Sequence, residues 1–141
     1  MSYKNEMNLK FLSISENESF ARLAVASFCS NLKLTIEELS DIKTAVSEAV
    51  TNCVVHGYVN TVGYIEINCE IVDDIITIKI SDEGVGIEDI EEAKKPFFTT
   101  KPEMERSGMG FTVMEGFMDK MIVESQKGKG TVVTLIKKIK D

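Results

Sequence analysis

The sequence predicts an α+β fold, a two-layer sandwich in which helices cover one face of a mainly antiparallel β-sheet. Two pairs of strand patterns, within residues 64–80 and 121–138, are each joined by a short turn, as in β-hairpins. Two helical patterns follow each other before the first pair. Because helices and hairpins segregated along a chain form separate layers, we expect one domain over residues 1–141 with one core between the layers.

The chain is expected to begin with a strand, in which apolar and polar residues alternate from Met7 to Phe11. Ser15 or Asn17 is a suitable cap for the helix that follows. Arg22 falls between the apolar positions of this helix, so we expect it to face the solvent. Those apolar positions are Phe20, Leu23, Ala24, Phe28 and Leu32.

The second helix has recognisable signals at both ends. Thr35 is followed three residues later by Glu38, which is the pattern of a capping box. Gly57 offers an easy stop near His56. Between these ends, apolar residues recur at three- and four-residue steps, so one face of the helix points at the core. They are Ile36, Leu39, Ile42, Val46, Ala49, Val50 and Cys53.

The rest of the chain alternates turns with short elements. The first hairpin turns at Asp73-Asp74, and the second turns within residues 128–130. Between the hairpins, residues 87–95 are acidic and weakly helical, and residues 96–107 lack periodicity, which indicates a loop. An amphipathic helix is expected over residues 108–120.

Composition excludes several classes of function. The net charge is −7 and no basic block is present, so direct nucleic-acid binding, which depends on neutralising phosphates, is not expected. No apolar run reaches the length of a membrane span, and the start of the chain lacks the apolar segment of a signal peptide. Cys29, Cys53 and Cys69 lie far apart within apolar patterns, which predicts reduced core residues and a cytoplasmic setting.

The strongest candidate site lies in the second helix. Glu48 and Asn52 are four residues apart, so their side chains sit one turn apart on the same side. The surrounding residues are apolar or small, and polar groups in such a run need a bonding partner. Taken alone, the pair favours a structural role, in which neighbouring backbone satisfies both side chains.

Three glycine-containing motifs accompany this pair. Asp82-x-Gly84-x-Gly86 follows a strand, where a carboxylate can accept from an amino group and glycine permits close approach of the backbone, although the pattern also fits a plain turn. In the segment Arg106-Ser107-Gly108-Met109-Gly110, glycines open a helix whose free N–H groups favour phosphate. Thr131 follows the glycines of the last turn and is either a ligand-binding hydroxyl or an ordinary strand residue.

The order and spacing of these motifs resemble the GHKL (Bergerat) ATPase fold of gyrase, Hsp90-type chaperones, mismatch-repair ATPases and histidine kinases. The N box corresponds to Glu48-x-x-x-Asn52-x-x-x-His56-Gly57, and the two glycine boxes are those at residues 82–86 and 106–110. Within that superfamily the chain looks like the anti-sigma-factor serine kinases of spore-forming bacteria. This closer resemblance covers nearly the whole chain, including residues 17–22, 47–57, 96–102 and 105–111.

The resemblance implies ATP or ADP and Mg²⁺ as ligands. Asp82 would bind the exocyclic amine of adenine with Thr131 nearby, and Asn52 would ligate Mg²⁺. Glu48 would be the catalytic residue that accepts the proton of an attacking hydroxyl. The two glycines of the first box, Gly84 and Gly86, would leave space for the base. The second glycine box and the preceding lid would hold the phosphates through Thr99, Thr100, Lys101, Arg106, Ser107, Gly108, Met109 and Gly110.

The resemblance also implies partners. A sporulation sigma factor would be sequestered, an anti-anti-sigma protein would be phosphorylated on a serine, and the kinase would be a homodimer; Arg22 is a candidate partner contact. The only histidine, His56, lies inside the N box, so a histidine kinase acting on itself is disfavoured. No transducer domain of the gyrase type is expected after the last strand. Two alternatives stay open, namely a general-stress anti-sigma kinase and a nucleotide-switched binding module without catalysis.

Overall fold

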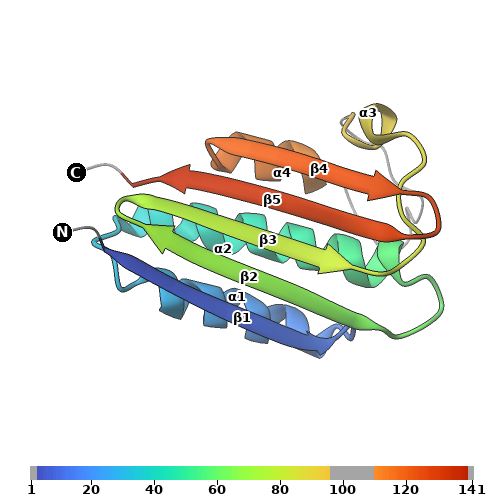
Figure 1. Cartoon of the computed structure of the whole chain (residues 1–141), viewed down its shortest axis with the longest axis horizontal. Coiled ribbons are helices and arrows are strands. Elements are labelled where there is room, and N and C mark those ends of the chain that lie inside the picture. Colours follow the sequence, from blue (N-terminus) through green and yellow to red (C-terminus); the bar gives the residue numbers. More distant parts are fainter. Residues whose placement is uncertain (1–2, 96–109, 140–141) are drawn as a thin grey trace.

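A five-stranded antiparallel sheet forms one layer of the molecule and the helices form the other (Figure 1). The structure, a computed structural model, describes residues 3–95 and 110–139. Neighbouring strands follow the order β1-β2-β3-β5-β4, and every pair is antiparallel. The predicted two-layer α+β class is therefore confirmed. The strands are β1 (Lys4–Leu12), β2 (Tyr64–Val72), β3 (Ile75–Asp82), β4 (Lys120–Gln126) and β5 (Gly130–Lys138).

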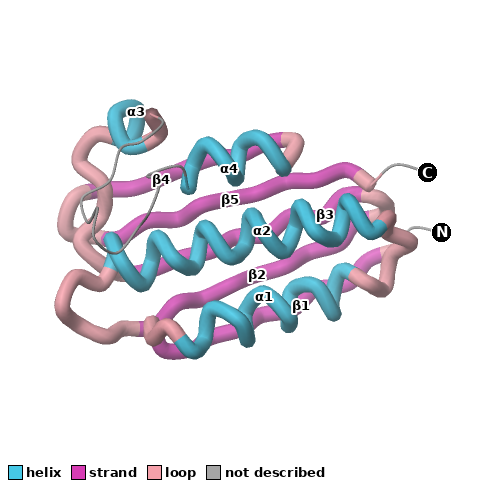
Figure 2. The backbone as a smooth tube through the Cα atoms, turned by 180° about the vertical axis from the view of Figure 1, so that it is seen from behind, coloured by secondary structure: helices cyan, strands magenta, loops and turns pink. Residues whose placement is uncertain are grey.

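The helical layer consists of three helices side by side, with α2 in the middle (Figure 2). A short fourth helix, α3, lies at the end of the sheet where β4 turns into β5 (Figure 1). Both chain termini lie at the opposite end (Figure 1). The helices are α1 (Glu16–Cys29), α2 (Ile36–Asn52) with its π-helical continuation η1 (Cys53–Gly57), α3 (Ile90–Ala93) and α4 (Gly110–Phe117).

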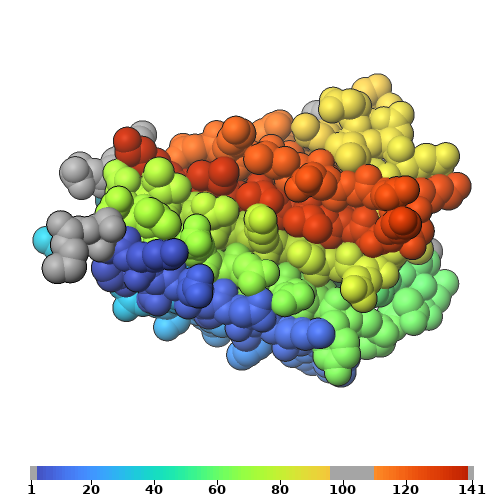
Figure 3. Space-filling model, in the orientation of Figure 1, coloured from blue at the N-terminus to red at the C-terminus, as the bar shows by residue number. Residues whose placement is uncertain are grey.

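Alternation along the central strands builds the core. On β2 and β3, every second side chain is buried against the helices, and residues between them, such as Asn68 and Lys79, are exposed on the other face. Among the described residues that face carries no helix, and the strands cross it from blue β1 through green β2 and β3 to red β5, with orange β4 at the far edge (Figure 3). The buried set includes Ile65, Ile67, Cys69, Ile71, Ile76, Ile78 and Ile80.

The buried face of α1 differs from the prediction. Ala21, Val25 and Cys29, spaced by four residues, form the stripe that seats the helix on the core. Phe20 and Leu23 are 50% and 55% exposed. Phe28 does pack against the core, as predicted. The prediction was wrong for Phe20 and Leu23 because two stripes on this helix carry apolar residues, and the one with the smaller side chains packs inward.

Arg22 also differs from the prediction that it faces the solvent. It is half-buried, because it lies beside α2 rather than on the outer side of α1. Its guanidinium donates to Ser47 Oγ at 3.5 Å and to Ser19 Oγ at 3.3 Å. At the start of the helix, Ser15 takes the N-cap position without a side-chain bond, and Asn17 donates its amide to Leu12 O.

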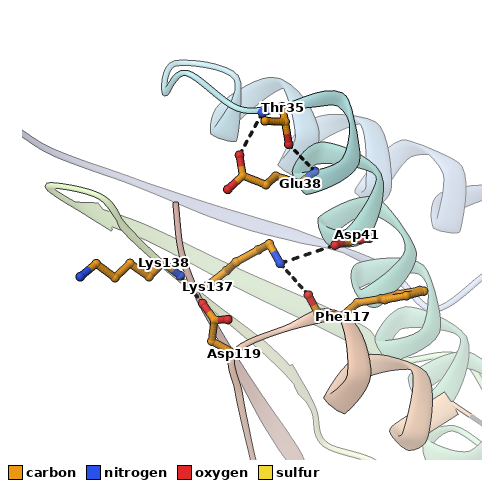
Figure 4. A network of polar contacts seen from close by, with 7 residues as sticks. All are labelled: Thr35, Glu38, Asp41, Phe117, Asp119, Lys137 and Lys138. Carbon is orange, nitrogen blue, oxygen red and sulfur yellow. Dashed lines mark hydrogen bonds and ion pairs between the residues drawn. The ribbon is translucent and has the colours of Figure 1, made fainter. Parts of the chain in front are cut away.

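The predicted capping box at the start of α2 is confirmed. Thr35 Oγ1 accepts from Glu38 N at 3.0 Å, and Glu38 Oε1 accepts from Thr35 N at 2.9 Å (Figure 4). The first apolar position behaves differently, because Ile36 lies in the exposed first turn and is 90% exposed. The end also differs, because Gly57 belongs to the π-helical turn, which Tyr58 N closes by donating to Cys53 O at 3.0 Å.

A buried lysine joins three elements at the end of the molecule far from α3 (Figure 4). Lys137 of β5 is 8% exposed, and its Nζ donates to the carbonyl oxygen of Phe117, the last residue of α4, at 2.7 Å. The same Nζ lies 3.7 Å from Asp41 Oδ2 of α2. A cation at the last carbonyl of a helix is favourably placed. Lys137 therefore fixes α4 to α2 and to the sheet.

The remaining expectations concern cysteines and membranes. All three cysteines are buried and unpaired, as predicted. Burial raises the pKa of the Cys29 and Cys69 thiols to about 12, so both are neutral core residues. Within the described residues, no helix has the length and apolar character needed to cross a membrane.

Candidate functional site

A cavity of about 790 Å³ opens between the end of α2, the start of α4 and the adjoining end of the sheet. Ligand pockets commonly occupy roughly 300–1,000 Å³ and combine apolar walls with a few polar groups. The walls here follow that pattern. Apolar lining residues include Ala49, Ile80, Val85, Ile87, Phe111 and Val133, and polar ones include Asn52, His56, Asp82 and Thr131.

Helix α2 brings Glu48 and Asn52 to the first residue of α4. A Cβ placed on Gly110 would lie 3.1 Å from Asn52 Oδ1 and 3.4 Å from Glu48 Oε2. Both side chains are half-buried, and Asn52 and Gly110 line the cavity. The structure thus brings together the N-box pair and the last glycine of the second glycine box. A larger residue at Gly110 would crowd both polar groups.

Asp82 is the most deeply buried acidic group of the cavity, at 7% exposure. Its carboxylate accepts from Gly84 N at 2.9 Å and also from the backbone N–H of Thr131 and the thiol of Cys53. Burial raises the pKa of Asp82 above its ordinary value, and these three donors oppose the rise. The carboxylate is thus held in one place by protein donors, with the cavity on its open side.

The glycines of the first glycine box pack against protein backbone. A Cβ on Gly84 would lie 2.0 Å from Gly57 O, and Val85 N donates to that same oxygen at 2.9 Å. Gly86 has φ +75°, and a Cβ there would lie 2.1 Å from Gln126 O. Glycine is needed at both positions because the backbone of another segment, at Gly57 or at Gln126, lies in direct contact with this loop. Only Gly86 of the two lines the cavity.

Gly57 is explained in the same way. The sequence suggested that it ends the helix, but its φ is not in the left-handed region. A Cβ at this position would lie 3.0 Å from Asp82 Oδ2. The residue is therefore small because the N box passes directly over the aspartate of the first glycine box.

Ser125 of β4 is a site residue that the sequence does not single out. Its Oγ accepts from Ile87 N at 2.7 Å and lies 2.8 Å from both Gly130 O and Thr131 Oγ1. Nearby, Gly128 N donates to Val85 O at 2.6 Å. The β4–β5 turn thus supports the loop after β3. The hairpin register, which pairs Ser125 with Thr131, is the signal that could have identified it.

Tyr58 is a second residue that the motifs do not reveal. Its hydroxyl donates to Tyr64 O at 2.6 Å and accepts from Glu83 N at 2.7 Å. Its ring lies over Gly63, where a Cβ would come within 2.3 Å of it. Tyr58 therefore ties the segment after the N box to the start of the first glycine box.

Several predicted residues are not brought to the cavity. Arg22 does not line it, and neither does Glu48, which lies beside the lining residue Gly110. Gly84 supports the loop from behind. The remaining predicted phosphate and lid residues lie outside the described part of the chain; they are Thr99, Thr100, Lys101, Arg106, Ser107, Gly108 and Met109.

The donor set of the cavity fits Mg²⁺ held jointly with a ligand. Among residues 3–95 and 110–139, no three His, Cys, Asp or Glu side chains are grouped so that they could hold a metal ion by themselves. Mg²⁺ usually keeps several waters and takes only one or two protein oxygens when phosphates supply the others. The amide oxygen of Asn52, next to the carboxylate of Glu48, is compatible with this arrangement.

Comparison with known proteins agrees with this geometry. Residues 15–137 match the model of the histidine kinase-like ATPase domain. The chain is 60% identical over 139 residues to the anti-sigma F factor of Caldanaerobacter subterraneus subsp. tengcongensis, covering 99% of this chain and 97% of that protein. It is 58% identical over 135 residues to the anti-sigma F factor of Clostridium acetobutylicum, covering 96% and 94%. The chain belongs to the anti-sigma F factor family.

Solved structures show the same fold. The structure of the RsbU and RsbW domains of Rv1364c from Mycobacterium tuberculosis aligns with a TM-score of 0.69 at 16% identity, covering 96% of this chain and 32% of that one. The histidine kinase domain of the Erythrobacter litoralis EL346 blue-light activated kinase aligns with a TM-score of 0.58 at 15% identity, covering 86% and 60%. The predicted superfamily and the predicted sporulation branch are both confirmed.

Proposed function

We propose that this protein is an ATP-dependent serine kinase that also sequesters a sporulation sigma factor and phosphorylates its anti-anti-sigma partner. The observation that carries the catalytic part is that Glu48 and Asn52 both lie against Gly110, and that Asn52 and Gly110 line the cavity. This places a carboxylate, an amide oxygen and the start of a helix in one place. Phosphoryl transfer requires mainly positioning and charge stabilisation, together with a group that orients the nucleophile.

Each side chain has a distinct part in the reaction. Asp82 accepts from the adenine amine, with Thr131 beside it. The γ-phosphorus leaves the oxygen that bridges it to the β-phosphate and bonds to the serine oxygen, while Glu48 accepts the serine proton. Backbone N–H groups at the start of α4 bind the phosphates. The proposed phosphate and lid residues 99–101 and 106–109 would complete this site and exclude water.

Mg²⁺, held by the Asn52 oxygen and the phosphates, would neutralise charge during transfer. Glu48 lies one helical turn from Asn52, so the proton acceptor and the metal-binding side of the nucleotide face the same region. A nucleotide switch without catalysis needs no carboxylate there. This position favours the kinase over the alternative of a binding module.

The proposal also covers the binding partners of the protein and its location in the cell. Relatives at 58–60% identity carry the name anti-sigma F factor, which supports a sigma factor as partner rather than the general-stress alternative. We further propose an anti-anti-sigma substrate, a homodimer, Arg22 as a partner contact, and a cytoplasmic setting. The net charge of −7 suits a basic segment of a sigma factor.

A transfer assay tests the chemistry. Purified protein is incubated with γ-labelled ATP, Mg²⁺ and a candidate anti-anti-sigma protein, and label on its serine is measured. Glu48→Gln is expected to abolish transfer while ATP and sigma-factor binding remain. Glu37→Gln makes the same change on the exposed first turn of α2 and is expected to leave transfer intact. If Glu48→Gln removed ATP binding together with transfer, Glu48 would have a structural role.

A further inference from the structure

Ser125 is the third member of a row of polar side chains that crosses three strands at the cavity end of the sheet. The register places Asp82 of β3 opposite Thr131 of β5, and Thr131 opposite Ser125 of β4. Directly opposed residues of antiparallel strands point to the same face. Asp82 and Thr131 line the cavity, and Ser125 lies one strand further out, against the loop after β3.

The contacts of Ser125 Oγ determine where its single proton goes. Ile87 N donates to this oxygen at 2.7 Å, and Gly130 O lies 2.8 Å away. A carbonyl oxygen cannot donate, so the bond to Gly130 requires the Ser125 proton. Thr131 Oγ1 is also 2.8 Å from Ser125 Oγ. Because the Ser125 proton is already used, the proton of this second bond must come from the Thr131 hydroxyl. Thr131 therefore donates to Ser125.

This assignment fixes the hydrogen-bonding character of the cavity wall. Once the proton of Thr131 is directed at Ser125, Thr131 Oγ1 offers only lone pairs to a ligand. The carboxylate of Asp82, when ionised, also only accepts. A ligand group that meets this part of the wall must therefore be a donor, because a carbonyl there would face two acceptors.

We propose that Ser125 is a positioning residue that holds the Thr131 hydroxyl as an acceptor and so makes the cavity select a purine with a 6-amino group over one with a 6-oxo group. The inference rests on the proposed function, in which Asp82 and Thr131 face the purine base of a nucleotide. In its simplest form, the selection is between ATP and inosine triphosphate. The ribose and triphosphate of these nucleotides are identical, so their comparison isolates the base edge.

Binding of the two nucleotides to the full chain tests the proposal. Dissociation constants for ATP and for inosine triphosphate are measured with Mg²⁺, and their ratio is the readout. Wild type is expected to prefer ATP. Ser125→Ala frees the Thr131 hydroxyl to rotate and donate, so the preference for ATP is expected to fall about tenfold, the size of one hydrogen bond.

Two further variants make the test specific. Thr131→Val removes the hydroxyl at nearly constant volume, so it is expected to reduce the preference as well, and adding Ser125→Ala to it should change the ratio no further. Ser81→Ala removes a hydroxyl from the opposite face of β3 and should leave the ratio at its wild-type value.

The outcomes separate this inference from the proposed function. If Ser125→Ala weakened both nucleotides equally, Ser125 would only support the loop at Ile87, and the inference would be overturned while nucleotide binding stood. A Thr131→Val variant that kept the full preference for ATP would also overturn the inference, and nucleotide binding would again stand. If wild type bound neither nucleotide, the proposed function itself would fail, and this inference with it.

Discussion

At Asp82, the requirements of folding and of ligand binding oppose each other. Burial at 7% exposure disfavours the charged form and raises the pKa, whereas a base-binding role requires an ionised acceptor. The protein donors at Gly84, Thr131 and Cys53 reduce this conflict without removing it. Ionised Asp82 therefore costs stability in the nucleotide-free protein.

This cost has a predictable pH dependence. Because the folded-state pKa lies above the unfolded value, the stability contributed by Asp82 is complete at pH below the unfolded pKa and is lost as pH rises through the folded pKa. Asp82→Asn cannot ionise, so its free energy of unfolding relative to wild type is expected to increase from about pH 4 to pH 7. Urea denaturation of both proteins at a series of pH values measures this difference in the free energy of unfolding. A constant difference would contradict the prediction, and Asp74→Asn on the β2–β3 turn, away from the cavity, is the control.

A pair of glycines tests how closely the loops of the site pack. Gly84→Ala would put a methyl group 2.0 Å from Gly57 O, where both partners are backbone and cannot move aside cheaply. We expect a loss of more than about 2 kcal/mol in the free energy of unfolding. Gly116→Ala in α4 meets nothing within 4 Å and is expected to gain about 0.5–1 kcal/mol from helix propensity. Denaturant titration measures the free energy of unfolding of both variants. Similar values for the two would mean that the loop around position 84 shifts to accommodate the methyl group.

At the scale of elements, α4 is important because its two ends serve different purposes. Its first residue, Gly110, lines the cavity beside Asn52, and its last, Phe117, is bonded through its carbonyl to Lys137. Because the helix spans only Gly110–Phe117, an anchor at one end restrains the other. The buried lysine thus contributes to the geometry of the site from the far end of the helix.

Removing this anchor is expected to be costly. Lys137→Met keeps the length and apolar stem of the side chain but deletes the donor to Phe117 O and the ion pair with Asp41. We expect the free energy of unfolding to fall by about 1–3 kcal/mol. Lys138→Met is the matched control, because Lys138 is exposed and its bond to Asp119 is made by its backbone N, which the substitution keeps (Figure 4). Its change should stay within about 0.5 kcal/mol. Equal effects in the two variants would argue against the anchor.

The elements also show what a single sequence can and cannot predict. The strands and α2 were predictable because each buries one face with a clear period of two or about 3.6 residues. The buried face of α1 was not, because Phe20 and Leu23 have helical spacing as good as that of Ala21 and Val25, and periodicity does not say which stripe meets the core.

The same division holds for the site. Asn52, Asp82, Gly110 and Thr131 were predictable because they lie in motifs at the ends of elements, and those ends meet at one cavity. Ser125 was not, because its importance depends on the strand register that sets it opposite Thr131. Tyr58 was missed for a similar reason, since its partner Glu83 belongs to a different part of the chain.

At the scale of the molecule, the cavity lies at one end of the sandwich and is walled by both layers and by the loops that join them. A ligand in the cavity contacts α2, α4, β3 and β5 at once, and these elements come from separate parts of the sequence. Such a ligand binds only when the layers are assembled. Nucleotide binding should therefore stabilise the whole fold and not a single loop.

Thermal unfolding measures this coupling. A ligand that binds only the folded state at a hundred times its dissociation constant adds about 2.7 kcal/mol. For a chain of 141 residues we expect ATP with Mg²⁺ to raise Tm by roughly 6–15 °C. Asp82→Asn, which replaces one acceptor oxygen of the carboxylate by a donor, should lose most of this shift. Asp74→Asn on the β2–β3 turn, at the other end of the strands from the cavity, should keep it. A shift that survived in Asp82→Asn would mean that the triphosphate and the start of α4 supply the binding energy without the base pocket.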